Sequence, residues 1–370
     1  MDSEFAGALL YSAFIVTFLM AGSICLHRYH EITKHAPRAH ILCLALACYV
    51  AALYWVEVLL IMMNIDWAVH CYPLFIWLGL VCVVLLYHFV YLVTGTGERL
   101  HFPMLHYLIP SGLALLFVWW DAFIPFAERY RIITSFNRID ADQPLWETVY
   151  QLMPVSYSIY IIIYGVMAYR RVWFYRIAVD NYSADEERTS MYWIYYFIAV
   201  VTGCFPKPLI TVMAVNLGIP LWVQCTMVWF PFALTYLIYN AIKGNYILVQ
   251  PAEELNDRTS RLVDRKRFEH YMATKKPYLN SDLCITDLLA DLCTNRTYLS
   301  SFINREYGVN FKTLINEFRL RELERLRLGS NGKNHSNMQL IMAAGFGSYR
   351  NYLAASRRKY RKGVLRYVLR

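Results

Sequence analysis

Long apolar segments separated by short polar connections fill the first 243 residues of the chain. Seven of these segments reach the roughly 20 residues that a helix needs to cross the hydrocarbon layer of a bilayer. Tyrosine and tryptophan gather near many of their ends, where amphipathic rings favour the headgroup level. The pattern predicts seven transmembrane helices, with approximate bounds 7–27, 40–63, 72–94, 103–126, 149–169, 191–215 and 219–243.

After this apolar part, hydrophobic residues take the spacing of short amphipathic helices. We expect a basic membrane-proximal linker and the start of a leading helix at 244–267, followed by a helical domain at 268–370. A break at Cys293 separates two short helices, and Thr294 or Asn295 can cap the second one, which runs to Arg305. Two short helices joined by a tight turn are a helix-turn-helix motif. The first helix places four apolar residues on one face: Ile285, Leu288, Leu289 and Leu292.

The second helix of this motif has two different faces. Four residues have the spacing to pack inward: Tyr298, Leu299, Phe302 and Ile303. Six polar, mostly small residues are expected to face outward: Asn295, Arg296, Thr297, Ser300, Ser301 and Asn304. Such side chains suit a helix in a major groove, where Arg, Asn, Ser and Thr reach base edges.

A longer helix over 311–328 leads to a second motif of the same kind. Gly345 is expected to end a short helix with positive φ, Phe346 to pack under the turn, and Ser348 to cap the next helix. The expected DNA-facing residues of that helix are Ser348, Tyr349, Arg350, Asn351, Arg357 and Arg358. Two such motifs about 50 residues apart are a stronger signal than one.

The composition supports a division into two parts. Of the 370 residues, 58% are hydrophobic and 17% charged, whereas a soluble domain has about 45–50% apolar residues. Residues 1–243 contain 13 Lys and Arg against 15 Asp and Glu, a net charge of −2. Residues 244–370 contain 23 against 12, a net charge of +11. The basic C-terminal part therefore favours an anionic partner.

Lys and Arg in the connections orient the expected bundle, because cytoplasmic loops carry the positive excess. The first, third and fifth connections together hold eight, whereas the second and sixth hold none. The fourth holds three arginines and four carboxylates. With seven spans, this pattern places the N-terminus outside and the basic C-terminal part in the cytoplasm.

Two charged residues within expected spans mark a candidate signal site, because a charge at the bilayer centre is costly unless it is paired or hydrated. Glu57 lies in the second span, and Lys207 lies between two prolines in the sixth. Both a signal site and a structural ion pair between Glu57 and Lys207 are open alternatives. The nine cysteines form no C-x-x-C pair, and no catalytic constellation is present. We expect no enzyme, cofactor or metal.

Residues 268–362 resemble the DNA-binding domain of the AraC/XylS family of transcription regulators. The resemblance lies in the segments PYLNSDL, NRTYLSSFINREYGVNF, RLREL and AAGFGSYRNY. It implies a helical domain with two helix-turn-helix motifs, whose recognition helices enter successive major grooves on one face of DNA.

The chain departs from the family pattern in both motifs. Leu289 and Ile341 stand where the family has a small Ala, and Cys293 stands at the Gly of the first turn. The closing Pro is missing, and three further positions differ: Cys284 for a capping Thr, Ser356 for a Phe and Arg361 for a Gly. The departures imply looser packing of the second half, or DNA binding by charge more than by base readout.

These observations predict an all-α protein of the bacterial inner membrane: a seven-span bundle that receives an unknown signal, followed by a regulator domain that binds double-stranded DNA. A signal would shift the bundle between two arrangements. In a homodimer, this shift would change the spacing of the two C-terminal parts, and hence whether they bind paired half-sites on DNA. The alternative is a seven-helix receptor or carrier in the lipid bilayer, whose basic tail binds a partner protein or anionic lipid.

Overall fold

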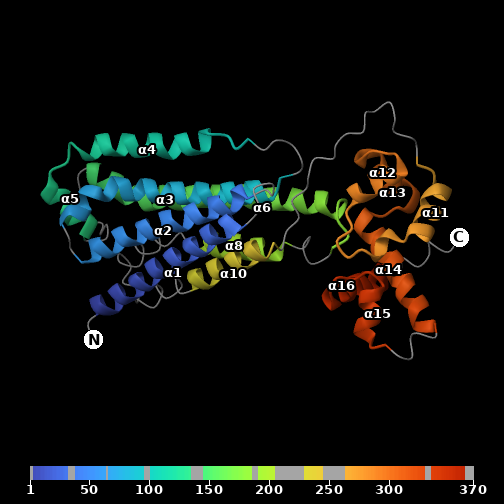
Figure 1. Ribbon diagram of the computed structural model, residues 1–370. Coiled ribbons are helices and arrows are strands. Elements are labelled where there is room, and N and C mark those ends of the chain that lie inside the picture. The colour runs from blue at the N-terminus through green and yellow to red at the C-terminus, as the bar shows by residue number, and fades with distance from the viewer. Residues whose placement is uncertain are drawn as a thin grey trace. The chain divides into compact units, whose positions relative to one another are not determined.

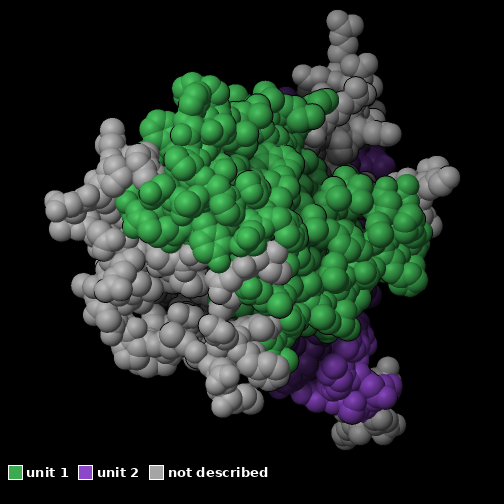
Figure 2. All heavy atoms as spheres, turned by 90° about the vertical axis from the view of Figure 1, so that its left-hand side faces the viewer, with its two compact units in different colours: residues 1–94, 100–172, 192–243 green, residues 95–99, 173–191, 244–370 purple. Residues whose placement is uncertain are grey.

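The computed structural model describes nine ranges of the chain, within which it contains helices and no strand (Figure 1). The ranges are 3–31, 38–63, 66–95, 101–134, 145–185, 191–204, 229–244, 263–329 and 335–362. The chain forms two compact units, coloured separately in Figure 2. Unit 1 comprises Met1–Thr94, Leu100–Val172 and Tyr192–Lys243, and unit 2 comprises Gly95–Arg99, Trp173–Met191 and Gly244–Arg370.

Unit 1 is a bundle of apolar helices. Helix α2 lies between α1 and α3, α4 packs on α3, and α10 contacts α8 and α1 (Figure 1). The helices are α1 (Ser3–Glu31), α2 (Ala39–Met62), α3 (Asp66–Val93), α4 (Leu105–Asp121), α5 (Phe126–Thr134), α6 (Leu145–Asp180, which continues into unit 2), α8 (Tyr192–Cys204) and α10 (Trp229–Lys243).

Four described helices are long and apolar enough to cross a membrane. Their spanning segments are Tyr11–Glu31, Ala39–Ile61, Asp66–Val93 and Glu147–Asp180. Helix α4, at the expected fourth span, has 17 residues and is shorter than the roughly 20 that a span takes. The expected sixth and seventh spans include residues 205–215 and 219–228, which lie outside the described residues. The expectation of a membrane protein is thus met by four helices of spanning length.

The outer surface of unit 1 supports a lipid environment. Leu108 and Leu115 on α4 are 64% and 70% exposed, and Ile163 and Val166 on α6 are also exposed. Large apolar side chains gathered on exposed helix faces are costly in water but not against acyl chains.

Two arginines that follow α4 in sequence are paired with nearby carboxylates. Arg129 donates to the buried Asp121 at 2.5 Å, and Tyr150 donates to the same carboxylate. Arg131 forms an ion pair of 3.1 Å with the buried Glu147. Both arginines are thus held by carboxylates of the same unit.

Unit 2 contains short helices around α14, an 18-residue helix that contacts α13, α15 and α16. The apolar spacing over 311–328 predicts this helix with its observed bounds. The elements are α11 (Arg265–Lys275), the 3₁₀ turns η2 (Pro277–Leu279) and η3 (Ile285–Leu288), α12 (Leu289–Leu292), α13 (Arg296–Tyr307), α14 (Phe311–Leu328), α15 (Asn337–Ala343) and α16 (Tyr349–Lys362).

Candidate nucleic-acid interface

A tight turn at residues 293–295 sets the start of α13. Cys293 ends α12 in the left-handed conformation, with a φ of 50°. Asn295 caps α13, because its Oδ1 accepts a hydrogen bond of 2.9 Å from the backbone N–H of Tyr298. Thr294, the other expected cap, is fully buried instead. The four apolar residues expected to share one face before this turn, from Ile285 to Leu292, are all buried.

Helix α13 has an apolar inner face and a polar outer face. Leu299, Phe302 and Ile303 are buried, as their spacing predicts. The expectation that Tyr298 packs inward is wrong, because its side chain is 49% exposed. Tyr298 is about 100° around the helix from Leu299, at the edge of the apolar stripe. The six expected outward residues are exposed or partly exposed: Asn295, Arg296, Thr297, Ser300, Ser301 and Asn304.

Helix α16 begins in the same way after a second turn. Gly345 has a φ of 93°, Phe346 is buried, and the Ser348 hydroxyl accepts a 3.2 Å hydrogen bond from the N–H of Asn351. These three features confirm the expected turn. Of the expected DNA-facing residues, Tyr349, Arg350 and Arg357 are exposed, and Ser348 and Arg358 are partly exposed.

Asn351 is not on the exposed face where the sequence pattern places it. Its side chain is buried, and its Nδ2 donates a hydrogen bond of 3.1 Å to Asp185. The expectation of exposure is therefore wrong. The helical period assigns Asn351 to the polar face of α16 but cannot show that another segment covers that face.

Among the described residues, Arg319 on α14 is the largest side chain that is almost completely buried, at 1% exposure. Its guanidinium donates to the carbonyl oxygens of Tyr278 at 2.8 Å and Asn280 at 2.7 Å, with further bonds to Ser281, Ala184 and the side chain of Asn316. Burial lowers the pKa of Arg319 to about 10, so the group stays charged at neutral pH. One side chain thus satisfies carbonyls from several segments of unit 2.

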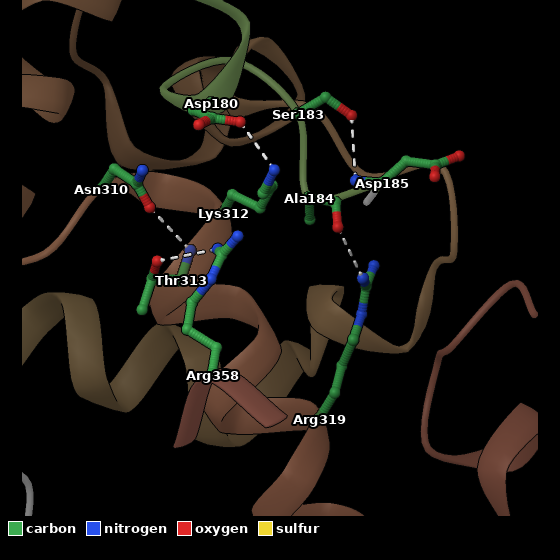
Figure 3. A network of polar contacts seen from close by, with 9 residues as sticks. All are labelled: Asp180, Ser183, Ala184, Asp185, Asn310, Lys312, Thr313, Arg319 and Arg358. Carbon is green, nitrogen blue, oxygen red and sulfur yellow. Dashed lines mark hydrogen bonds and ion pairs between the residues drawn. The ribbon is translucent and has the colours of Figure 1, made fainter. Parts of the chain in front are cut away.

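Residues 180–185, which begin with the last residue of α6, form a network with α14 and its neighbours (Figure 3). Asp180 accepts an ion-paired hydrogen bond of 2.6 Å from Lys312, and the Ala184 carbonyl accepts one of 3.3 Å from Arg319. Arg358 donates to Thr313 at 3.5 Å. This network was not among the features that the sequence pattern predicts.

The network had only a weak signal in the sequence. Tyr182 and Ala184 alternate with Ser183 and Asp185, which is the period of a strand, but four residues are too few to predict pairing. The contacts also join residues as far apart as Ala184 and Arg319, 135 positions along the chain. No local pattern specifies a partner at that distance.

The candidate intramembrane site is described only in part. Glu57 on α2 is buried, and its Oε1 has no hydrogen-bond partner among the described residues. Lys207 lies outside those residues. The alternatives of a signal site and a structural ion pair therefore both stay open.

No protein-family model matches the chain, and neither a curated protein nor a solved structure matches it. Across the described ranges, His, Cys, Asp and Glu side chains form no group of three that could hold a metal ion. The interpretation of unit 2 therefore rests on its own residues: two capped helices with polar outer faces, placed on a common central helix.

Replacing Cys293 by glycine should stabilise unit 2 by about 1 kcal/mol, because a side chain in the left-handed conformation is strained by about that amount. Cys293 is exposed, so little packing is lost. Hydrogen exchange of peptides from α12 and α13 would report the gain as slower exchange. Faster exchange in the variant would contradict the assigned strain.

Proposed function

We propose that the protein is a membrane-tethered, sequence-specific DNA-binding transcription regulator whose transmembrane bundle is the signal input. The observation that carries the proposal is a repeated arrangement in unit 2. A short helix, a tight turn and a capped helix with a polar outer face occur twice, at α12–α13 and α15–α16, on either side of α14. Such a pair suits two recognition helices that read two segments of a major groove.

The charges of the C-terminal part support the same proposal. Residues 244–370 carry a net charge of +11, and Arg350 and Arg357 on α16 are exposed. Neutralising phosphates with such residues releases counterions and supplies the non-specific part of DNA affinity. Polar residues on the outer faces of α13 and α16 would then supply base contacts.

The long apolar helices of unit 1 support the membrane-tethered part of the proposal. With four helices of spanning length in the same chain, a signal that acts on the bundle would need no separate messenger to reach the DNA-binding part. The rival function is a membrane receptor or carrier whose basic C-terminal part contacts anionic lipid or a partner protein. Lipid attraction requires only charge, whereas two capped helices with polar outer faces are suited to base recognition.

An Arg296→Ala/Arg350→Ala double variant tests the proposal. The full chain in detergent should retain a few fragments from a genomic pool, and the variant should bind them at least about 30-fold more weakly, since each of the two base-contacting arginines contributes about 1–3 kcal/mol. Filter retention across a salt series measures this loss.

The matched control is Arg305→Ala/Arg327→Ala, which removes the same charge from exposed positions outside the first turns of α13 and α16. It should keep the fragment preference and change mainly the salt dependence. Equal, unselective binding by all three proteins would support the lipid or partner-protein alternative instead.

A further inference from the structure

The strap, defined as residues 180–185, is a packed part of unit 2. It begins with Asp180, the last residue of α6, the helix that also supplies the candidate span Glu147–Asp180. Tyr182, Ser183 and Ala184 are 5%, 2% and 1% exposed. Connections between helices normally run over the surface, because their backbone groups need water. The burial of the strap therefore requires that unit 2 supply its hydrogen-bond partners.

Backbone hydrogen bonds to residues 283–285 supply some of these partners. The N–H of Ala184 donates to the carbonyl of Leu283 at 3.2 Å, and the N–H of Ile285 donates to the carbonyl of Tyr182 at 2.8 Å. These two bonds flank Ser183 and Cys284, which face each other as an isolated antiparallel bridge. The strap thus pairs with the segment that leads into η3 and α12.

Side chains hold both ends of the strap. Asp180 pairs with Lys312, which is 3% exposed, at the start of α14. At the other end, Asp185 accepts the hydrogen bond from the buried Asn351 on α16. Buried charged and polar groups keep such partners because an unpaired group would be costly.

The strap also engages the first turns of both candidate reading helices. The guanidinium carbon of Arg296, the first residue of α13, lies 5.1 Å from the ring centre of Tyr182, within the range of a cation–π contact. Asn351, in the first turn of α16, is held by Asp185. Both residues belong to the set expected to contact DNA, and neither can make its strap contact and a base contact at the same time.

We infer that the strap is an autoinhibitory element that must leave the first turns of α13 and α16 before both helices bind DNA. The inference rests on the proposed function and adds how binding is regulated. When the binding-competent state is only a fraction of the population, the apparent dissociation constant rises by the inverse of that fraction. Anything that displaces the strap therefore tightens DNA binding.

A reversible disulfide can hold the strap in place. Two residues can lie opposite each other in an antiparallel ladder without a hydrogen bond between them, with ladder bonds on either side. Their Cα atoms are then about 4.5 Å apart, which is within the range that a disulfide spans. Ser183 and Cys284 form such a pair, so Ser183→Cys places two thiols opposite each other. Oxidation then locks the strap, and reduction releases it, in the same full-length chain.

The experiment compares DNA binding by the oxidised and reduced Ser183→Cys chain in detergent, with sheared genomic fragments as the probe. Peptide mapping verifies the crosslink between the introduced thiol and Cys284. The oxidised chain should bind at least about tenfold more weakly than the reduced chain, and reduction should restore binding. The controls are the natural chain and Ser183→Cys/Cys284→Ser, both of which should bind equally under the two conditions.

Three results would overturn the inference, and they differ from one another. Equal or tighter binding by the crosslinked chain would show that the strap does not compete with DNA, while the proposed function stands. Absence of the crosslink under oxidation would contradict the pairing of the strap with Cys284. Absence of DNA binding by every protein, reduced chains included, would remove the proposed function and the inference with it.

Discussion

Replacing Arg319 by methionine is expected to reduce the free energy of unfolding of unit 2 by about 4 kcal/mol, because buried acceptors that lose their donor cost about 1–3 kcal/mol each. Methionine fills much of the volume but donates no hydrogen bond. The buried carbonyls of Tyr278 and Ala184 would lose the bond that Arg319 donates, whereas the partly buried carbonyls of Asn280 and Ser281 could bond to water instead. A domain is stable by only about 5–15 kcal/mol, so unit 2 would lose roughly a quarter or more of its stability.

Hydrogen exchange of peptides from α13 and α14 in the full chain is the suitable measurement, because unfolding of a chain with two units is not a single transition. Arg321→Met is the matched control, since Arg321 is exposed and lies two residues further along α14. It should change the free energy of unfolding by less than about 0.5 kcal/mol. An Arg319→Met chain that exchanges as slowly as this control would contradict the role assigned to Arg319.

Gly345→Ala is expected to cost at least about 3 kcal/mol, since overpacking and an unfavourable φ add together. A Cβ at this position would lie 2.3 Å from the carbonyl oxygen of Tyr278 and 2.7 Å from the Cα of Leu279. Both atoms belong to the backbone, so neither can move aside by changing a rotamer. The turn between α15 and α16 would have to deform, and α16 would lose its defined start.

Gly308→Ala separates the two causes. Gly308 has a similar positive φ of 66°, but a Cβ there would meet nothing within 4 Å. This control should cost only about 1 kcal/mol, the part due to backbone conformation. Hydrogen exchange of peptides from α15 and α16 measures the cost at Gly345, and peptides from α13 and α14 measure it at Gly308. Equal losses in the two variants would show that the contact with Tyr278 does not limit the turn.

Local patterns in the sequence predicted the short-range features of unit 2. The bounds of α14, the caps Asn295 and Ser348, and the positive φ of Gly345 all depend on residues within one or two helical turns. Such features follow from helical period and capping chemistry, which are local.

Features that depend on distant segments could not be predicted. The buried side chain of Asn351 has its hydrogen-bond partner in Asp185, and the carbonyl of Ala184 has its donor in Arg319. Each pair is separated by more than 130 positions along the chain. The lengths of the apolar segments likewise predict seven spans. They do not show that α4, the helix in the fourth segment, ends at Asp121, whose carboxylate pairs with Arg129. The two capped helices α13 and α16 could be predicted from the sequence, whereas the segment that contacts their first turns could be identified only in the structure.

Flotation of lipid vesicles can show whether one chain joins membrane insertion to specific DNA binding. Full-length protein is reconstituted into vesicles and mixed with a fragment selected by the natural chain and an unselected fragment of equal length. We expect the selected fragment to float with the vesicles, and Arg296→Ala/Arg350→Ala protein to float without it. Floating protein that carries neither fragment, or carries both fragments equally, would contradict a membrane-tethered, sequence-specific regulator.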